Sequence, residues 1–137
     1  MERNLIMSEA ANAYYFSEGQ VWRYHTRPNE PESAILINKI EYHSGLGAIF
    51  HISIAGVQVK NPHGEEPLTQ LGHFPVVAAS LEQSLTELVD TNVDNPSYLE
   101  GYESWREAFV QGKAGVFNIP VEQIISFVEE AINRSEA

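Results

Sequence analysis

The sequence contains no cysteine, and only 8 of its 137 residues are lysine or arginine. Without cysteine there is no disulfide framework, no thiolate nucleophile and no zinc–sulfur site. The few basic residues stand against 19 acidic ones, which gives a formal net charge of −11. A field of this sign repels phosphate backbones and anionic lipid headgroups, so nucleic-acid and membrane binding are disfavoured. It attracts a basic protein partner, and an acidity that serves solubility alone is the equally weighted alternative.

Long apolar runs are also missing, since the longest fall far short of the roughly 20 residues that span a bilayer. Residues 1–7 lack a basic region followed by an apolar core, so no signal peptide is expected and the cytoplasm is the predicted location. The length suits one domain, and a hydrophobic content of 43% suffices for one core. We expect a lead-in over residues 1–18, with a short helix from Ser8 to Phe16, and a single domain over residues 19–137.

The first half of the chain has the pattern of strands. Residues 20–26, 34–42 and 48–54 are rich in strand-forming types and alternate between apolar and polar positions. Gly56 predicts a bulge before a short fourth strand at residues 57–60. Residues 61–74 form the longest stretch without a regular pattern and are expected to be a loop. Short connections between the strands predict antiparallel pairing in a meander.

The second half has the pattern of helices. Residues 76–89 place leucines on one face, with Ser80 and Gln83 as a capping box if the helix starts at Ser80. Asn95 and Pro96 indicate a helix start, Gly112 a helix end, and Pro120 the start of a last helix with an apolar stripe. Residues 116–119 are expected to form a short strand. The order predicts an α+β fold: a curved antiparallel β-meander of three to five strands, followed by about three helices packed on one face.

No motif in the sequence indicates catalysis, a metal or a cofactor. No two of the five histidines have the i,i+4 spacing of a helical metal site. A convergence of His51, His63 and His73 with Glu65 or Glu66 is an alternative to structural roles, which are favoured. His51 and Ser53 share a strand face, but no nucleophile elbow surrounds any serine. We therefore predict no catalytic residue, no metal ligand and no cofactor.

The most unusual group lies on the first strand and the loop that follows it. Arg27 precedes Pro28 and is held extended, so it either presents its guanidinium to a ligand or closes an ion pair with Glu30 or Glu32. The ion pair is the favoured interpretation. Aromatic and arginine side chains dominate protein interfaces when they are exposed. The candidate binding residues are Trp22, Tyr24, Arg27, Glu30, His51, Ser53, His73, Trp105 and Arg106.

The run Gly19-Gln20-Val21-Trp22-x-Tyr24-x-Thr26-Arg27-Pro28 resembles the opening of a family of small bacterial proteins without an assigned activity. The resemblance extends through residues 51–53, 60–62, 73–75 and 112–117 and covers most of the chain from Gly19 to the last helix. It implies a bacterial origin and one structural unit. It carries over no activity and no catalytic residues.

The leading functional hypothesis is a non-catalytic, cytoplasmic binding or inhibitory protein, for example an immunity-type partner of a basic toxin. High negative charge, small size and the lack of a catalytic motif motivate it. The alternative is an enzyme or small-ligand-binding protein with a pocket near Trp22, Arg27, His51 and the loop at residues 61–74. A structural module that acts as a homo-oligomer is a third hypothesis.

Overall fold

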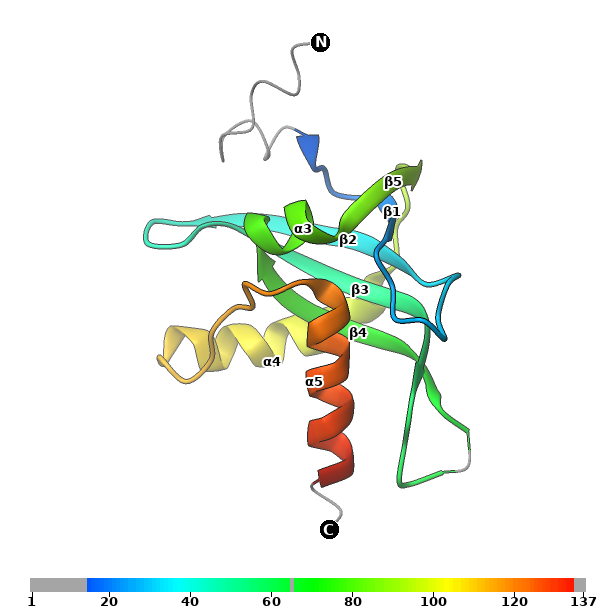
Figure 1. The fold of residues 1–137 in the computed structure, drawn as a ribbon. Coiled ribbons are helices and arrows are strands. Elements are labelled where there is room, and N and C mark those ends of the chain that lie inside the picture. The colour runs from blue at the N-terminus through cyan, green and yellow to red at the C-terminus, as the bar shows by residue number, and fades with distance from the viewer. Residues whose placement is uncertain (1–14, 65, 135–137) are drawn as a thin grey trace.

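The computed structural model describes residues 15–64 and 66–134, and within them the chain forms an open five-stranded sheet with helices on both faces (Figure 1). Most of the predicted N-terminal helix, up to residue 14, lies outside these residues. The elements follow one another as β1 (Val21–Tyr24), β2 (Ala34–His43), β3 (Gly47–Val59), β4 (Leu68–Val77), α3 (Ala78–Ser84), β5 (Leu85–Asp90), the 3₁₀ turn η1 (Pro96–Tyr98), α4 (Leu99–Val110) and α5 (Val121–Arg134).

The sheet confirms the predicted meander and the α+β class. Its strand order is β4-β3-β2-β1-β5, and all four neighbouring pairs are antiparallel. Gly56 has a φ of +81°, and a Cβ atom there would lie 2.9 Å from the Cα atom of Ser33. Only glycine fits such a position without strain, and it lets β3 bend and continue to Val59. The predicted fourth strand at residues 57–60 is therefore the end of β3.

Two predicted elements are wrong in extent. The second half of the expected loop at residues 61–74 belongs to β4, an edge strand. It tolerates Pro75 because Pro75 has the same orientation as Val77, whose N–H points away from β3, so no hydrogen bond of the β3–β4 ladder is lost. The predicted helix at residues 76–89 shortens to α3, because its first two residues end β4 and its last five belong to β5 beside β1. Ser80 lies inside α3, where its hydroxyl donates to the Phe117 carbonyl at 3.2 Å instead of capping the helix. The leucine spacing suited either state, and pairing with β1 decided it.

The main core lies between the sheet, α3 and α5. Successive strand residues point to opposite faces, and Phe50, Ile52 and Ile54 of β3 point to this core. The predicted apolar stripe of α5 meets them through Val121 and Ile124, which are fully buried. Residues 116–119 form no full strand, although Phe117 makes one parallel bridge to Val76 of β4. In the described part of the chain, no helix has the length and apolar character needed to cross a membrane.

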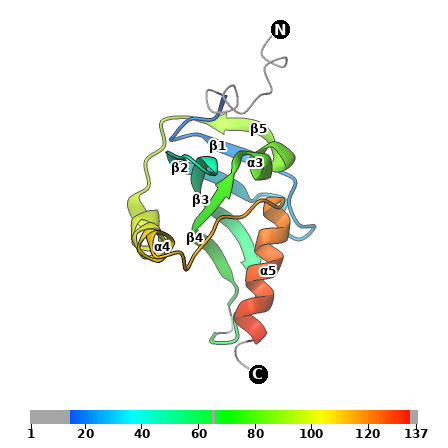
Figure 2. The same ribbon diagram turned by 90° about the vertical axis from the view of Figure 1, so that its left-hand side faces the viewer.

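The helix α4 covers the opposite face of the sheet, as Figure 2 shows. The predicted start at Asn95 and Pro96 is that of the 3₁₀ turn η1, where the Asn95 side chain accepts a hydrogen bond from the Ser97 backbone N–H at 3.1 Å. α4 itself begins at Leu99, directly after this turn. Its aromatic stripe packs on His51, which neighbours Phe50 on β3 and so points away from the main core. The helices thus lie on both faces of the sheet and not on the single face that was expected. The reason is that the second face also carries side chains that are shielded from water.

Candidate functional site

All predicted site residues except Ser53 fall into three places in the fold. The first place is the main core, which contains Trp22 and Tyr24. The Trp22 ring packs on Phe16 and its indole N–H donates to the Gln20 side chain at 2.9 Å. The Tyr24 hydroxyl lies 2.8 Å from the Ser33 hydroxyl, and burial raises the pKa of Tyr24 to about 12. Both rings are at most 7% exposed, so they stabilise the fold and do not form a binding surface.

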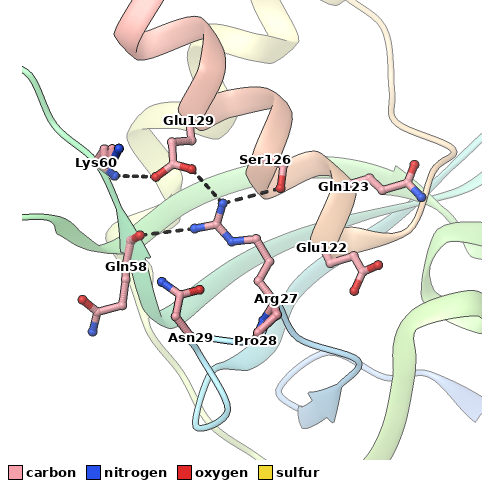
Figure 3. Close-up of a pocket in the computed structure, with 9 residues that line it drawn as sticks. All are labelled: Arg27, Pro28, Asn29, Gln58, Lys60, Glu122, Gln123, Ser126 and Glu129. Carbon is pink, nitrogen blue, oxygen red and sulfur yellow. Dashed lines mark hydrogen bonds and ion pairs between the residues drawn. The ribbon is translucent and has the colours of Figure 1, made fainter.

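Arg27 lies at the junction of the β1–β2 loop, β3 and α5 (Figure 3). Together with its partner Glu30 it forms the second place. Arg27 Nε and Nη2 donate to the two carboxylate oxygens of Glu30 at 3.1 and 2.5 Å. Nη2 also donates to the Gln58 carbonyl at 3.2 Å, and Nη1 donates to Glu129 at 2.9 Å and to Ser126 at 3.5 Å. A guanidinium has five N–H donors, so every donor has an acceptor. The intramolecular ion pair favoured from the sequence is the arrangement observed, with Glu30 as the partner.

The pKa values in this cluster are shifted so that Arg27 and Glu129 both stay charged. Hydrogen bonding to Glu30 raises the pKa of Arg27 above its usual value, although partial burial opposes the shift. Partial burial acts to raise the pKa of Glu129, but hydrogen bonds from the Lys60 backbone and from Arg27 hold it below its usual value. A hollow of about 480 Å³ lies beside Arg27, between Pro28, Gln58 and Glu122. Because the guanidinium is saturated from within, it ties α5 to the sheet and offers no free donor to this hollow.

The third place is a chain of three side chains under α4. His51 Nε2 lies 2.8 Å from a carboxylate oxygen of Glu41, and His51 Nδ1 lies 2.9 Å from Nε2 of His73. The two imidazole rings are nearly coplanar, at 15°, as an in-plane hydrogen bond between them requires. β2, β3 and β4 each supply one of the three residues. The sequence singled out the two histidines but not Glu41.

The helix α4 closes over this chain. The rings of Tyr102 and Trp105 meet the His51 ring edge-on at 4.8 and 5.0 Å. The Tyr102 hydroxyl and Arg106 Nη1 both donate to the Glu41 carboxylate, at 3.1 and 3.2 Å. A Cβ atom on Gly101 would lie 3.0 Å from the Cβ of His73, so glycine is what lets α4 approach this closely.

The protons in this chain follow from the acceptor at its end. A carboxylate only accepts, so His51 Nε2 carries the proton and Nδ1 of a neutral His51 accepts from His73 Nε2. Burial lowers the pKa of His51, against the opposing effect of Glu41. Burial, and then the nearby His51, lower the pKa of His73 to about 4. Both imidazoles are therefore neutral at pH 7, and a base this weak removes few protons there.

The remaining predicted residue, Ser53, accepts a hydrogen bond from the Asn38 amide at 3.1 Å and does not join the histidines. A convergence of the histidines was the less favoured alternative from the sequence, and it occurs only for His51 with His73, because His63 lies in the β3–β4 turn. Across residues 15–64 and 66–134, no three His, Asp or Glu side chains are grouped as metal ligands would be. The sequence analysis missed Glu41 and Tyr102 as members of this site. Lys39 of β2 pairs with His51 of β3, and Glu41 lies two residues after Lys39, so the pairing of these strands is the signal that places Glu41 near His51.

A further surface emerges from the distribution of charge. Between Lys60 and Arg106 the sequence has no lysine or arginine, and Arg106 is bonded to Glu41. In Figure 2, β5 lies across the top of the molecule, and the connection after it descends along the left side to α4. Six exposed acidic side chains on these segments, which we call the acidic flank, form no ion pair with any described residue. They are Glu87, Asp90, Asp94, Glu100, Glu103 and Glu107.

The alternative pocket predicted near Trp22, Arg27, His51 and residues 61–74 does not form among the described residues. Trp22 is buried in the main core, and His51 lies on the opposite face of the sheet under α4. Arg27 stands at a separate hollow beside α5. The resemblance to a bacterial family remains a prediction. Comparison of the chain with protein-family models, with curated proteins and with solved structures finds no match.

Proposed function

We propose that this protein is a non-catalytic binding or inhibitory protein that receives a basic protein partner on its acidic flank. The single observation that carries the proposal is the unpaired state of the six carboxylates. Arg23, Arg27, Arg106 and Arg134 are each engaged by carboxylates elsewhere, at distances of 2.5 to 3.9 Å. The negative charge of the flank is therefore not neutralised from within.

The placement of these charges on α4 supports recognition. At about 100° per residue, Glu100, Glu103 and Glu107 share one side of α4, opposite the aromatic stripe that faces the sheet. All three are exposed. The half-buried aromatic side packs on His51 of the sheet, so the three carboxylates point away from the sheet. Like-charged surfaces steer an oppositely charged protein during its approach.

The chemistry of the two buried polar clusters also favours binding over catalysis. All N–H groups of Arg27 are occupied, and the chain from Glu41 to His73 is covered by α4 and has a low basicity. Neither cluster offers a reactive group beside a free polar partner, which a catalytic site needs. An immunity-type role, in which the acidic flank covers a basic toxin in the cytoplasm, is the specific form of the proposal.

The test is affinity capture from an extract of the organism that carries the gene, with identification of the bound proteins by mass spectrometry. We expect basic proteins whose capture falls by about tenfold between about 50 and about 500 mM NaCl, because salt screens exposed charges. The variant carries Glu100→Gln, Glu103→Gln and Glu107→Gln, and should lose most of the capture.

The matched control removes the same number of charges away from the flank, through Glu66→Gln, Glu122→Gln and Glu130→Gln. It should capture the same proteins as the unmodified chain. Equal losses in both variants would mean that net charge alone is responsible and would overturn the proposal. Recovery of acidic proteins, of salt-insensitive ones or of none would also overturn it.

A further inference from the structure

Among the described residues, the strand β5 ends the sheet and is paired on one side only. Its neighbour is β1, and all residues from Thr86 to Asp90 are exposed. In the described part of the chain, no backbone–backbone hydrogen bond joins residues 86–90 to any segment other than β1. A strand in this position presents outward N–H and C=O groups, which are a template for a further strand.

The other edge of the sheet is treated differently. β4 contains Pro75, and the Phe117 segment lies against it through two hydrogen bonds, from Val77 N to the Phe117 carbonyl at 3.0 Å and from Phe117 N to the Pro75 carbonyl at 2.9 Å. Proline and a covering segment are common ways to block an edge strand. β5 has neither proline nor lysine.

The side chains of β5 combine apolar and acidic character. Leu88 and Val89 are 42% and 44% exposed, and Glu87 and Asp90 stand on either side of them. The acidic residues discourage self-association, because a second copy paired antiparallel about Leu88 and Val89 would set Glu87 opposite Asp90. The same charges favour a strand that carries lysine or arginine.

The pairing with β1 limits the length of the available edge. Register shifts interrupt the ladder on both sides of the Trp22↔Leu88 and Arg23↔Glu87 pairs. Bulges of this kind twist a strand and shorten its regular part. A partner segment that matches this edge is therefore short, with apolar residues at its centre.

We propose that the outer edge of β5 binds a short extended segment of a basic partner, which joins the sheet as an additional strand. Main-chain hydrogen bonds supply the attachment, Leu88 and Val89 supply apolar contacts, and Glu87 and Asp90 select lysine or arginine. This inference rests on the proposed function and assigns the part of the acidic flank at which the partner docks.

The probe is the synthetic peptide Lys-Val-Lys-Val-Lys-Val-Lys, with binding measured by fluorescence anisotropy and by amide hydrogen exchange on the full chain. We expect binding to slow exchange at the amides of residues 86–90. A peptide N-methylated at alternate residues keeps its charge but loses the backbone N–H groups that would donate to β5. It should therefore bind at least about tenfold more weakly. Equal affinity of the two peptides, no binding, or slowed exchange confined to α4 would overturn the proposal.

Two flank variants that each remove two negative charges separate this inference from the proposed function, with Glu66→Gln plus Glu130→Gln as the control outside the flank. Glu87→Gln with Asp90→Asn should weaken the peptide severalfold, Glu103→Gln with Glu107→Gln should weaken it less, and the control should leave its affinity unchanged. If only the α4 variant weakens binding, the β5 site is wrong and the acidic flank still binds basic partners. If neither variant weakens binding, the proposed function fails together with the β5 site. Thermal unfolding of each variant checks that it is folded.

Discussion

Arg27 illustrates how one side chain can fix three segments at once, since Glu30 in the loop, Gln58 in β3 and Glu129 in α5 all accept from it. The Glu30 side chain has no exposed surface and depends on Arg27 for its counter-charge. We predict that Arg27→Ala lowers the free energy of unfolding by about 3–5 kcal/mol, because it leaves a buried carboxylate unpaired. Urea unfolding measures this directly.

The comparison for that variant is Arg23→Ala. Arg23 meets Glu32 at 3.8 Å, and the two side chains are 43% and 84% exposed. Exposed pairs of this geometry contribute roughly 0–1 kcal/mol, so the control should unfold close to the unmodified chain. Similar losses for both variants would show that Arg27 acts as an ordinary surface arginine.

His73 makes the stability depend on pH. Its pKa falls from 6.5 to about 4 in the folded chain, so between these values the unfolded chain binds more protons than the folded one. The free energy of unfolding should therefore fall as the pH is lowered from about 6.5 to about 4. Urea unfolding at pH 7 and pH 5 should show this fall, and His73→Gln should reduce it. An unchanged pH dependence in the variant would assign the effect to other groups.

Among single residues, those with local rules were predictable and those with distant partners were not. Asn95 before Pro96 and the two prolines after Arg27 act within a few positions along the chain, so the sequence indicated the start of η1 and the loop. Glu41 joins His51 across two strands and meets Tyr102, which is 61 positions away. No spacing rule along the chain connects such residues, because the fold brings them together.

At the level of the elements, the position of α4 depends on Gly101. Replacing a helical glycine by alanine ordinarily stabilises a helix by about 1 kcal/mol. Here the new Cβ would lie 3.0 Å from the Cβ of His73, which its hydrogen bond to His51 holds in place. We predict that Gly101→Ala lowers the thermal unfolding midpoint and weakens the near-ultraviolet circular dichroism of Trp105.

Ser104 on the same helix supplies the control, since its side chain is exposed. Ser104→Ala should leave the midpoint unchanged or raise it slightly, in line with helix propensity. A gain of the same size for Gly101→Ala would mean that α4 shifts freely over the sheet.

Among the strands and helices, β4 and β5 are the elements whose state the sequence did not predict. The periodic stripes of α4 and α5 and the alternation of β3 are repeated over many residues, and these elements were predicted. β4 has a glycine and a proline within it, and β5 has leucines at a spacing that a helix also explains. Their state is decided by the neighbouring strand, so their own residues do not reveal it.

For the whole molecule, a net charge of −11 means that the folded chain repels itself. We predict that raising NaCl from about 20 to about 300 mM increases the thermal unfolding midpoint by a few degrees, because salt screens the repulsion between the unpaired carboxylates. Differential scanning calorimetry of the unmodified chain provides the measurement, and the Glu100→Gln, Glu103→Gln, Glu107→Gln variant should respond less. A midpoint that falls with salt would show that the surface ion pairs dominate over repulsion.

The strand order also has a consequence for the folding kinetics of the chain. β1 to β4 pair with their neighbours in sequence, but β5 pairs with β1, so Tyr24 must meet Leu85 after 60 intervening residues. Closing a loop of that size costs entropy before any contact repays it, which places this step late in folding. The segment that arrives last is held by one neighbour only, so during native fluctuations it should also be the first part of the sheet to open.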